Sequence, residues 1–315
     1  MSNNQWPHFA VMGAGAVGGY FGGMLARAGA PVTLIGRAQH VEAISQNGLF
    51  IEGINFQQRI AVAASTDVAA IKEAAIVLFC VKTLDTEGAA KALAPHLANE
   101  ALVMSFQNGV DNVARIRAAS AIEAIPTVVY VAAEMAAPGH VKHTGRGDLI
   151  IGELLQRDRS DERDLEKLAA LFVRAGVPCL VSENIAADLW TKLIINCAYN
   201  AISALSRARY GRIVRTSWTR EVMIQAIEEA AAVARAEGVR FPNVNLVELG
   251  LKLAEKMENT MSSTAQDMAR GKRTEIDSLN GYVARRGAAL GVATPVNQTL
   301  HALVKLLEEG QDLKT

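Results

Sequence analysis

The sequence predicts an α/β domain built on a mainly parallel sheet, followed by an all-α domain, with a cleft between the two. Three observations support this fold class. The chain has 315 residues, which is too long for one ordinary hydrophobic core. Short β-rich runs alternate with Ala-rich amphipathic segments as far as Ser182, and beyond it only long helical patterns occur. We therefore place the two domains at residues 1–182 and 183–315.

The first domain shows the alternation of strands and helices that is typical of βαβ units. An antiparallel ribbon at residues 138–152, a helix at 161–175 and a short strand at 177–181 are expected to complete it. The predicted strands of the main sheet are Phe9–Met12, Val32–Ile35, Ile76–Val81, Leu102–Phe106 and Pro126–Val131, and the predicted crossover helices are Val17–Ala28, Asp85–Leu97 and Asn112–Ala119.

The second domain is predicted to be entirely helical, because its apolar residues recur at helical spacing between Gly and Pro breaks. Residues 308–315 are polar, and we expect them to form a fraying end. The predicted helices are Ile185–Leu205, Arg220–Glu237, Val244–Glu258 and Thr274–Leu290.

Composition excludes several classes of function. Basic and acidic residues number 32 each, so no global field attracts nucleic acid or an anionic membrane. Cys80, Cys179 and Cys197 lie far apart in apolar runs and lack metal-ligand spacing, which predicts buried thiols and no metal site. The first eight residues lack a signal pattern, and no stretch is long and apolar enough to span a bilayer. These features predict a cytoplasmic protein.

A glycine-rich turn lies between the first predicted strand and the first predicted helix. Its sequence is Gly13-Ala14-Gly15-Ala16-Val17-Gly18. Gly13 permits a tight turn, Gly15 lets the backbone approach a pyrophosphate, and Gly18 permits close packing of helix on strand. The helix N-terminus adds N–H groups and a partial positive charge. A turn that uses glycine only for packing is the alternative, but the strand–turn–helix context favours a Rossmann-type dinucleotide site.

The residue that follows the second strand discriminates between the two nicotinamide dinucleotides. An NAD site usually has Asp or Glu there, which accepts hydrogen bonds from the ribose hydroxyls. This chain has Gly36-Arg37 instead. A guanidinium binds a 2′-phosphate through paired, charge-assisted hydrogen bonds, whereas a carboxylate repels it. We therefore predict NADP(H), the alternative for Arg37 being an ordinary solvated arginine.

A polar stripe marks the first helix of the second domain. Lys192, Asn196 and Asn200 recur at every fourth position, so all three leave the helix on one face. The rest of this helix is mostly apolar or small, and burying an unpaired amide or ammonium costs about 2 kcal/mol or more. The stripe is therefore expected to face a polar cavity or a ligand. The alternatives are a solvated face and a ladder of interdomain hydrogen bonds.

A polar block follows near the C-terminus, at residues 261–267 and 273–277. Thr274-Glu275 has the pattern of a helix start, with the carboxylate near the positive end of the helix dipole. This pattern alone favours a helix-capping role for Glu275 over a ligand-binding role.

Together these motifs resemble those of the ketopantoate reductase (2-dehydropantoate 2-reductase) family, from Phe9 to about Lys305. The glycine turn is shared with many dehydrogenases, whereas the ordered set of C-terminal motifs is specific. The motifs are the glycine turn, Val81-Lys82, Gln107-Asn108-Gly109, the Lys192, Asn196 and Asn200 stripe, Ser262-Ser263 with Asp267, and Thr274-Glu275-Ile276-Asp277 with Asn280-Gly281.

The resemblance implies NADPH-dependent reduction of ketopantoate to pantoate, a step of pantothenate biosynthesis, with Lys192 as the general acid. The chemistry is consistent, because an ammonium can stabilise and protonate the oxygen that gains charge when hydride reaches the carbonyl carbon. The partner is a small-molecule 2-keto acid, and surplus apolar helix faces are compatible with a homodimer. By resemblance, Asn108, Asn196, Asn200 and Ser263 contact the substrate, while Arg37, Lys82, Asn108 and Glu275 lie on the cofactor side.

Two departures from the family pattern concern the acyl group of the substrate. Pantoate-forming members often carry Asn-Gly where this chain has Tyr210-Gly211, and Thr260 stands where an amide is expected. Rival enzymes are a β-hydroxyacid dehydrogenase, an imine reductase and a glycerol-3-phosphate dehydrogenase, against which the Ser263 and Glu275 blocks argue. A regulatory module that senses NADP(H) without turnover is the rival from another class, and it does not require the proton donor Lys192.

Overall fold

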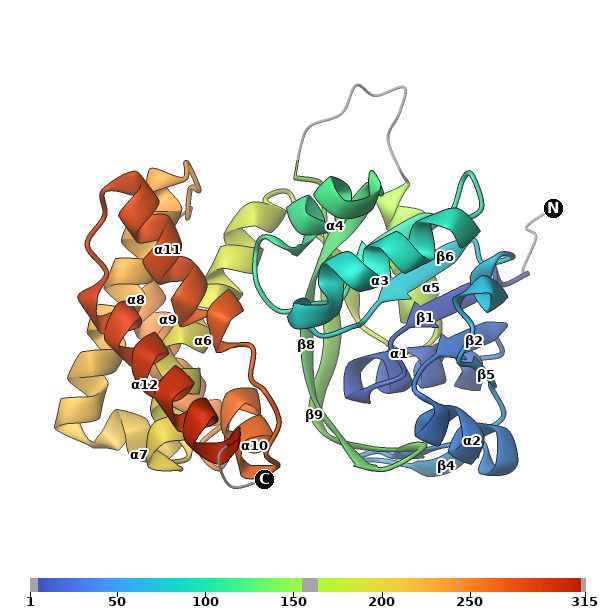
Figure 1. Cartoon of the computed structure of the whole chain (residues 1–315), viewed down its shortest axis with the longest axis horizontal. Coiled ribbons are helices and arrows are strands. Elements are labelled where there is room, and N and C mark those ends of the chain that lie inside the picture. Colours follow the sequence, from blue (N-terminus) through green and yellow to red (C-terminus); the bar gives the residue numbers. More distant parts are fainter. Residues whose placement is uncertain (1–4, 155–163, 243, 313–315) are drawn as a thin grey trace. The chain divides into compact units, whose positions relative to one another are not determined.

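The computed structural model describes residues 5–154, 164–242 and 244–312, which form two compact units. Unit 1 consists of the chain up to Gln107 together with residues 111–185. Unit 2 consists of residues 108–110 together with the chain from Ala186 onward. The chain therefore changes unit after Gln107, after Val110 and after Ile185. Figure 1 labels most of the helices and strands of both units.

Unit 1 is built on a mainly parallel sheet, as the sequence predicts. Its strands follow the order β4-β3-β9-β8-β7-β6-β1-β2-β5, with β10 beside β9. Among the described residues seven strand pairs are parallel, and only β3–β4 and β8–β9 are antiparallel. The strands are β1 Phe9–Met12, β2 Val32–Ile35, β3 Leu49–Glu52, β4 Gln57–Ile60, β5 Ala63–Ser65, β6 Ile76–Phe79, β7 Leu102–Ser105, β8 Ala124–Ala137, β9 His140–Ile151 and β10 Cys179–Val181.

Helices bury both faces of this sheet. Phe9 and Val11 of β1 pack into a core with residues of α1 and α5, whereas Ala10 and Met12 pack into a second core with residues of α3 and α4. Alternate residues of one strand thus enter opposite cores, which explains why β1 and β6 are apolar at every position. The helices are α1 Ala16–Arg27, α2 Ala38–Asn47, α3 Thr86–Leu93, α4 Asn112–Ser120 and α5 Leu165–Arg174.

The predicted antiparallel ribbon at residues 138–152 is confirmed only in part: this segment is the single strand β9, which pairs antiparallel with β8 after a turn at Pro138-Gly139. The sequence did not predict α2 or the short strands β3, β4 and β5. Strand β4 is Gln57-Gln58-Arg59-Ile60 at the edge of the sheet, and only Ile60 is buried. Its polar composition carries no alternation of apolar residues, so sequence periodicity could not reveal it. Residues 161–163 of the predicted 161–175 helix lie outside the described residues.

Unit 2 is entirely helical in the residues described, which confirms the predicted class. Its helices are α6 Ile185–Ser206, α7 Tyr210–Arg215, α8 Ser217–Ala236, α9 Leu246–Lys256, α10 Ser263–Ala269, α11 Asn280–Leu290 and α12 Pro295–Asp312.

Two predicted helix ends of unit 2 are wrong. Thr274 does not begin a long helix, because a single 3₁₀ turn, Ile276–Ser278, ends at Leu279 and α11 starts only at Asn280. The last polar segment does not fray from Glu308, because α12 continues to Asp312 and the Glu308 side chain is buried. A buried carboxylate needs a partner, and Glu308 accepts a hydrogen bond from the backbone N–H of Thr274.

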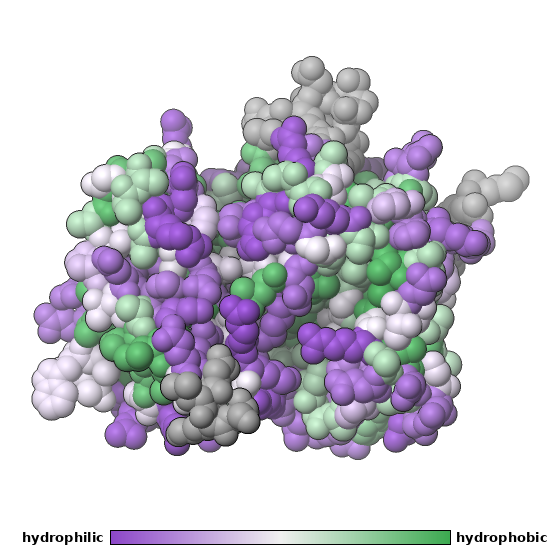
Figure 2. Space-filling model, viewed as in Figure 1, coloured by the Kyte–Doolittle hydropathy of each residue, from purple (hydrophilic) through white to green (hydrophobic). Residues whose placement is uncertain are grey.

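The cysteines are free thiols; Cys179 and Cys197 are buried, as predicted, whereas Cys80 is partly exposed. Burial raises the pKa of Cys179 to about 12, and it also raises the pKa values of Cys80 and Cys197. On the face drawn in Figure 2, hydrophilic residues are spread widely, with smaller hydrophobic groups between them. In the described ranges no helix carries an apolar stretch of the length that a bilayer requires.

Candidate active site

Gly13 and Gly18 are required by the packing of the turn between β1 and α1. Gly13 has a φ of +111°, and a Cβ there would lie 2.9 Å from the backbone of Cys80 and Val81. A Cβ on Gly18 would lie 2.2 Å from the Gly13 carbonyl oxygen and 2.7 Å from the Val11 side chain. Backbone atoms cannot yield to such contacts, so both positions need glycine for the fold itself.

Gly15 is different, because the chain gives it no reason of its own to be glycine. Its φ of −83° is accessible to any residue, and a Cβ there would meet no atom within 4 Å. Gly15 is also the residue that caps the N-terminus of α1, a helix of 12 residues. Unpaired N–H groups and the helix dipole favour an anion at such an end. Space kept open at this point fits a bound pyrophosphate better than a turn that serves packing alone.

This difference predicts opposite outcomes for two matched substitutions. Gly15→Ala should leave thermal stability unchanged or slightly higher, and it should weaken dinucleotide binding by about tenfold or more, which is about 1.4 kcal/mol. Gly18→Ala should instead destabilise the fold by about 1–3 kcal/mol, because its Cβ meets backbone. Thermal melts and cofactor titrations of both variants test this. Normal dinucleotide affinity in Gly15→Ala would contradict the assignment of the turn.

Arg37 lies where the cofactor prediction requires it, two residues after β2 ends at Ile35. A Cβ on Gly36 would lie 2.7 Å from the Cβ of Ala14, so glycine at 36 lets the end of β2 pack against the phosphate turn. The Arg37 side chain is exposed. It forms no ion pair with any residue that the structure describes. The guanidinium is therefore accessible to an anion beside the glycine turn.

Lys82 lies in an ordered loop after β6. The side chain of Gln107, two residues after the end of β7, donates to the carbonyl oxygen of Val81 at 3.1 Å and to the Thr86 hydroxyl at 2.8 Å. These bonds hold the loop before and after Lys82, and they also fix Gln107, the residue that precedes Asn108. The motif Gln107-Asn108-Gly109 is visible in the sequence, but the role of Gln107 is not.

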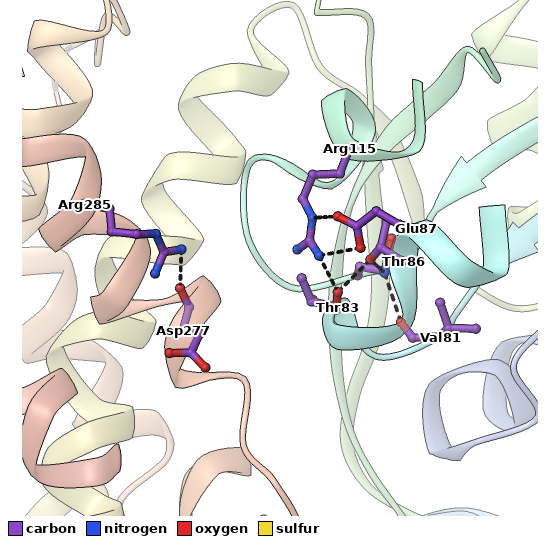
Figure 3. A network of polar contacts seen from close by, with 8 residues as sticks. Val81, Thr83, Thr86, Glu87, Arg115, Asp277 and Arg285 are labelled. Carbon is purple, nitrogen blue, oxygen red and sulfur yellow. Dashed lines mark hydrogen bonds and ion pairs between the residues drawn. The ribbon is translucent and has the colours of Figure 1, made fainter. Parts of the chain in front are cut away.

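Arg115 of α4 adds further hydrogen bonds to the part of this loop that follows Lys82. It donates to both oxygens of Glu87, at 2.7 and 2.9 Å, and to the carbonyl oxygen of Thr83 at 2.9 Å (Figure 3). The guanidinium that donates to Glu87 holds the pKa of this carboxyl below its usual range. Neither residue was identified from the sequence, because α3 and α4 carry no motif that pairs these positions. The exposed Lys82 thus sits on a loop supported from both sides.

Lys192, Asn108 and Glu275 are brought together in unit 2, although they are far apart in the sequence. The Lys192 ammonium donates to Oδ1 of Asn108 at 2.9 Å. Nδ2 of Asn108 in turn donates to Oε2 of Glu275 at 3.1 Å. The amide is oriented by its neighbours, since its acceptor faces the cation and its donor faces the anion. All three residues are partly exposed, so a ligand can reach this polar chain.

The stripe on α6 continues from Lys192 into a drier environment. Asn196 is half-buried and Asn200 is only 2% exposed. Within the described part of the chain, neither side-chain amide forms a hydrogen bond. The alternative of a satisfied ladder therefore finds no support for these two amides. Because a buried, unpaired amide costs about 1–3 kcal/mol, Asn200 in particular favours a ligand as its partner.

The adjacent serines of the polar block have different environments. Ser262 is buried and caps α10: its hydroxyl accepts from the N–H of Ala265 and donates to the carbonyl oxygen of Asn200. Its own N–H donates to the Ser203 hydroxyl. Ser263, the predicted substrate contact, is exposed at the start of α10. Ser262 thus fixes the backbone at Asn200, a role that sequence reasoning missed although serine is a preferred N-cap residue.

The two departures from the family pattern, Tyr210 and Thr260, are neighbours in the structure. The N–H of Tyr210 donates to the carbonyl oxygen of Thr260 at 3.0 Å. The Tyr210 ring is buried and stacks on Tyr199, with ring centroids 4.2 Å apart. Burial raises the pKa of the Tyr210 hydroxyl, which therefore stays neutral. The two departures therefore lie together, and Tyr210 packs on Tyr199, the residue that precedes Asn200 in α6.

Comparison with known proteins gives consistent matches over both units. The family model described as ketopantoate reductase PanE/ApbA matches residues 9–156, and the model of its C-terminal part matches residues 184–308. A 2-dehydropantoate 2-reductase from Pyrococcus abyssi is 36% identical over 94% of this chain and 96% of its own length. A second one, from Pyrococcus horikoshii, is 34% identical over 95% and 96%.

A solved structure extends the similarity to three dimensions. The crystal structure of a PanE/ApbA family ketopantoate reductase from Ralstonia eutropha JMP134 is 51% identical and matches with a TM-score of 0.90, covering 97% of this chain and 99% of that one. The similarity therefore spans the glycine turn of unit 1 and the polar stripe of unit 2 alike.

Proposed function

Because the chain belongs to the ketopantoate reductase PanE/ApbA family, we propose that it reduces 2-dehydropantoate to pantoate with NADPH. The observation that carries the proposal is the hydrogen-bonded chain of Lys192, Asn108 and Glu275. It holds an ammonium, a proton source, on the same helix face as two side-chain amides that form no hydrogen bond with the described residues. Relatives named 2-dehydropantoate 2-reductase over nearly their whole length support the substrate.

The proposed mechanism assigns each group one task. NADPH, when bound, supplies the hydride that the carbonyl carbon accepts. Gly15 leaves room for the pyrophosphate, and Arg37 pairs with the 2′-phosphate. Lys192 then breaks an N–H bond and forms the O–H bond of the product, after which its neutral amine takes a proton from water. Asn108 orients the Lys192 ammonium through the 2.9 Å hydrogen bond, so less reorganisation is needed when the oxygen becomes negative.

Arg37 should give the enzyme a preference for NADPH over NADH of at least about tenfold in dissociation constant, or about 1.4 kcal/mol. Fluorescence titration with both cofactors measures this preference. Arg37→Ala should lose most of it by weakening NADPH binding alone. Arg174→Ala is a control in the same unit, since Arg174 packs over the ring of Trp6. Equal affinities for the two cofactors in the unaltered protein would contradict the NADPH assignment.

The proposed function is tested by following NADPH oxidation with a panel of 2-keto acids and 3-keto acids. Turnover with 2-keto acids supports the reaction class, whereas turnover restricted to 3-keto acids would indicate a β-hydroxyacid dehydrogenase. Binding of NADPH with no turnover on any acid would favour a cofactor-sensing module. The predicted homodimer is tested separately, by light scattering of the purified chain.

A second candidate is reduction of a different 2-keto acid by the same chemistry. The observation that favours it is the pair Tyr210 and Thr260, where family members that form pantoate often carry amides. Tyr210 brings a buried aromatic ring, stacked on Tyr199, against α6, the helix that carries the polar stripe. Such a ring replaces hydrogen-bonding capacity by apolar surface. A larger or more apolar acyl group is the expected consequence if ketopantoate proves to be a poor substrate.

A further inference from the structure

The turn that carries Glu275 is held by α12 at two points. Before Glu275, the backbone N–H of Thr274 donates to Oε1 of Glu308 at 2.7 Å, and both residues are buried. After it, the side chain of Asp277 accepts from His301 at 2.7 Å and from Lys305 at 3.1 Å. Glu275 therefore lies between two anchors, and each anchor is a carboxylate.

The anchors form one connected network along a single face of α12. Lys305 bridges them, since it contacts Oδ2 of Asp277 at 3.1 Å and Oε2 of Glu308 at 3.0 Å. Residues 301, 305 and 308 are spaced by four and three positions, so they project from the same side of the helix. Each of the two carboxylates has a cationic or N–H partner, which a partly dry location requires.

Two further features support this geometry from α11. Arg285 donates to the carbonyl oxygen of Asp277 at 2.8 Å, which fixes the backbone of the turn (Figure 3). A Cβ on Gly281 would lie 2.7 Å from the His301 ring, so glycine at this position leaves room for the imidazole that reaches Asp277. The turn is thus restrained through its backbone and side chains by both neighbouring helices.

We propose that Glu308 and Asp277 are positioning residues that hold Glu275 against Asn108, and through Asn108 orient the Lys192 ammonium. The inference rests on the proposed function for its kinetic consequence. Glu275 reaches Nδ2 of Asn108 at 3.1 Å, and Oδ1 of the same amide accepts from Lys192 at 2.9 Å. Displacing Glu275 out of hydrogen-bond range would therefore release the Asn108 amide and disturb the acceptor of the ammonium.

Three variants of α12 test the proposal. Glu308→Ala removes the acceptor of the Thr274 N–H, Glu308→Gln keeps an oxygen acceptor there, and Glu309→Ala alters an exposed neighbour as control. Glu308→Ala should lower kcat about tenfold while KM changes by less than about threefold, because a misplaced acid acts on the transition state. Glu308→Gln should have a kcat within about threefold of that of the unaltered enzyme. The control Glu309→Ala should have the same kcat as the unaltered enzyme.

A readout that needs no turnover separates this inference from the proposed function. The side-chain amide signal of Asn108 in a ¹⁵N–¹H spectrum, assigned by its loss in Asn108→Ala, should shift or broaden in Glu308→Ala and stay in place in Glu308→Gln and Glu309→Ala. An unchanged Asn108 signal, or an unchanged kcat in an active enzyme, overturns the positioning role. No turnover by the unaltered enzyme counts against the proposed function alone. If Glu308→Ala does not fold, Asp277→Asn is judged by the same two readouts.

Discussion

Replacing Lys192 by alanine should lower kcat by about 10²-fold or more, because general-acid catalysis typically contributes about 10²–10⁴-fold. Loss of the ammonium removes both the proton and the positive charge that stabilises the oxygen as hydride arrives. NADPH affinity should remain nearly normal, since the glycine turn and Arg37 are the groups assigned to the cofactor. Steady-state kinetics with saturating NADPH, together with a cofactor titration, measure both quantities.

The control for this prediction is Lys252→Ala on α9. Lys252 is exposed and pairs with Glu248 one turn earlier on its own helix, so its loss should leave kcat unchanged. Lys192→Arg adds a further test, since arginine keeps the charge but holds its proton too tightly to act as an acid. Near-normal turnover in Lys192→Ala would remove this lysine from the mechanism, whatever the behaviour of the other variants.

Ketopantoate should be reduced with a kcat/KM far above that of pyruvate, by about 10²-fold and up to about 10⁴-fold. The reason lies in Asn196 and Asn200, whose amides have no hydrogen bond from the described residues. A distal hydroxyl on the substrate satisfies such groups, whereas pyruvate leaves them unpaired at a cost of about 1–3 kcal/mol each. Comparing ketopantoate, pyruvate and larger branched 2-keto acids under saturating NADPH measures the preference.

Asn200→Ala refines this comparison, because the proposal places its amide on the substrate and not on the reacting oxygen. The variant should raise KM for ketopantoate with a smaller effect on kcat, and it should narrow the gap to pyruvate. An enzyme that treats ketopantoate no better than analogues without a distal hydroxyl would keep its reaction class but lose the pantoate assignment. A preference for bulky keto acids would then point to Tyr210 as the residue that sets the size of the acyl group.

The elements that the sequence predicted well are those with strong local patterns. Strands β1 and β2 match their predicted bounds, since each is a short apolar run next to a glycine-rich turn. The helix with the polar stripe, α6, ends within one residue of its prediction. Sequence patterns did not reveal the edge strand β4, because it is polar. It pairs with a neighbouring strand along only one of its two edges. Its existence depends on pairing with β3, which no local pattern encodes.

The candidate site shows the same division between local and distant information. The glycine turn, Arg37 and the stripe of Lys192, Asn196 and Asn200 could be proposed from the sequence because each follows a local rule. The supporting contacts of Gln107, Arg115 and Ser262 were missed, because each joins segments that are distant in the chain. Family membership was also predicted correctly from the ordered set of motifs.

The supporting role of α12 was the least accessible to sequence reasoning. Residues 308–315 are polar and close to the end of the chain, which is typical of a fraying terminus. Glu308 is nevertheless buried, because its partner is a backbone N–H that lies 34 positions earlier. The burial of Glu308 depends on the tertiary fold, because the sequence does not show which backbone N–H will lie beside this carboxylate.

The chain crosses between the two units three times, and this limits how the protein can be divided into fragments. Residues 108–110 belong to unit 2 although the chain on either side of them belongs to unit 1. A C-terminal fragment that starts at Ala186 would therefore be expressed without Asn108, and its Lys192 would lose the acceptor described above. Co-expression with the N-terminal fragment would restore the missing segment as a second polypeptide. The helical unit is thus an incomplete autonomous module, and domain exchange between relatives must carry residues 108–110 along with the C-terminal helices.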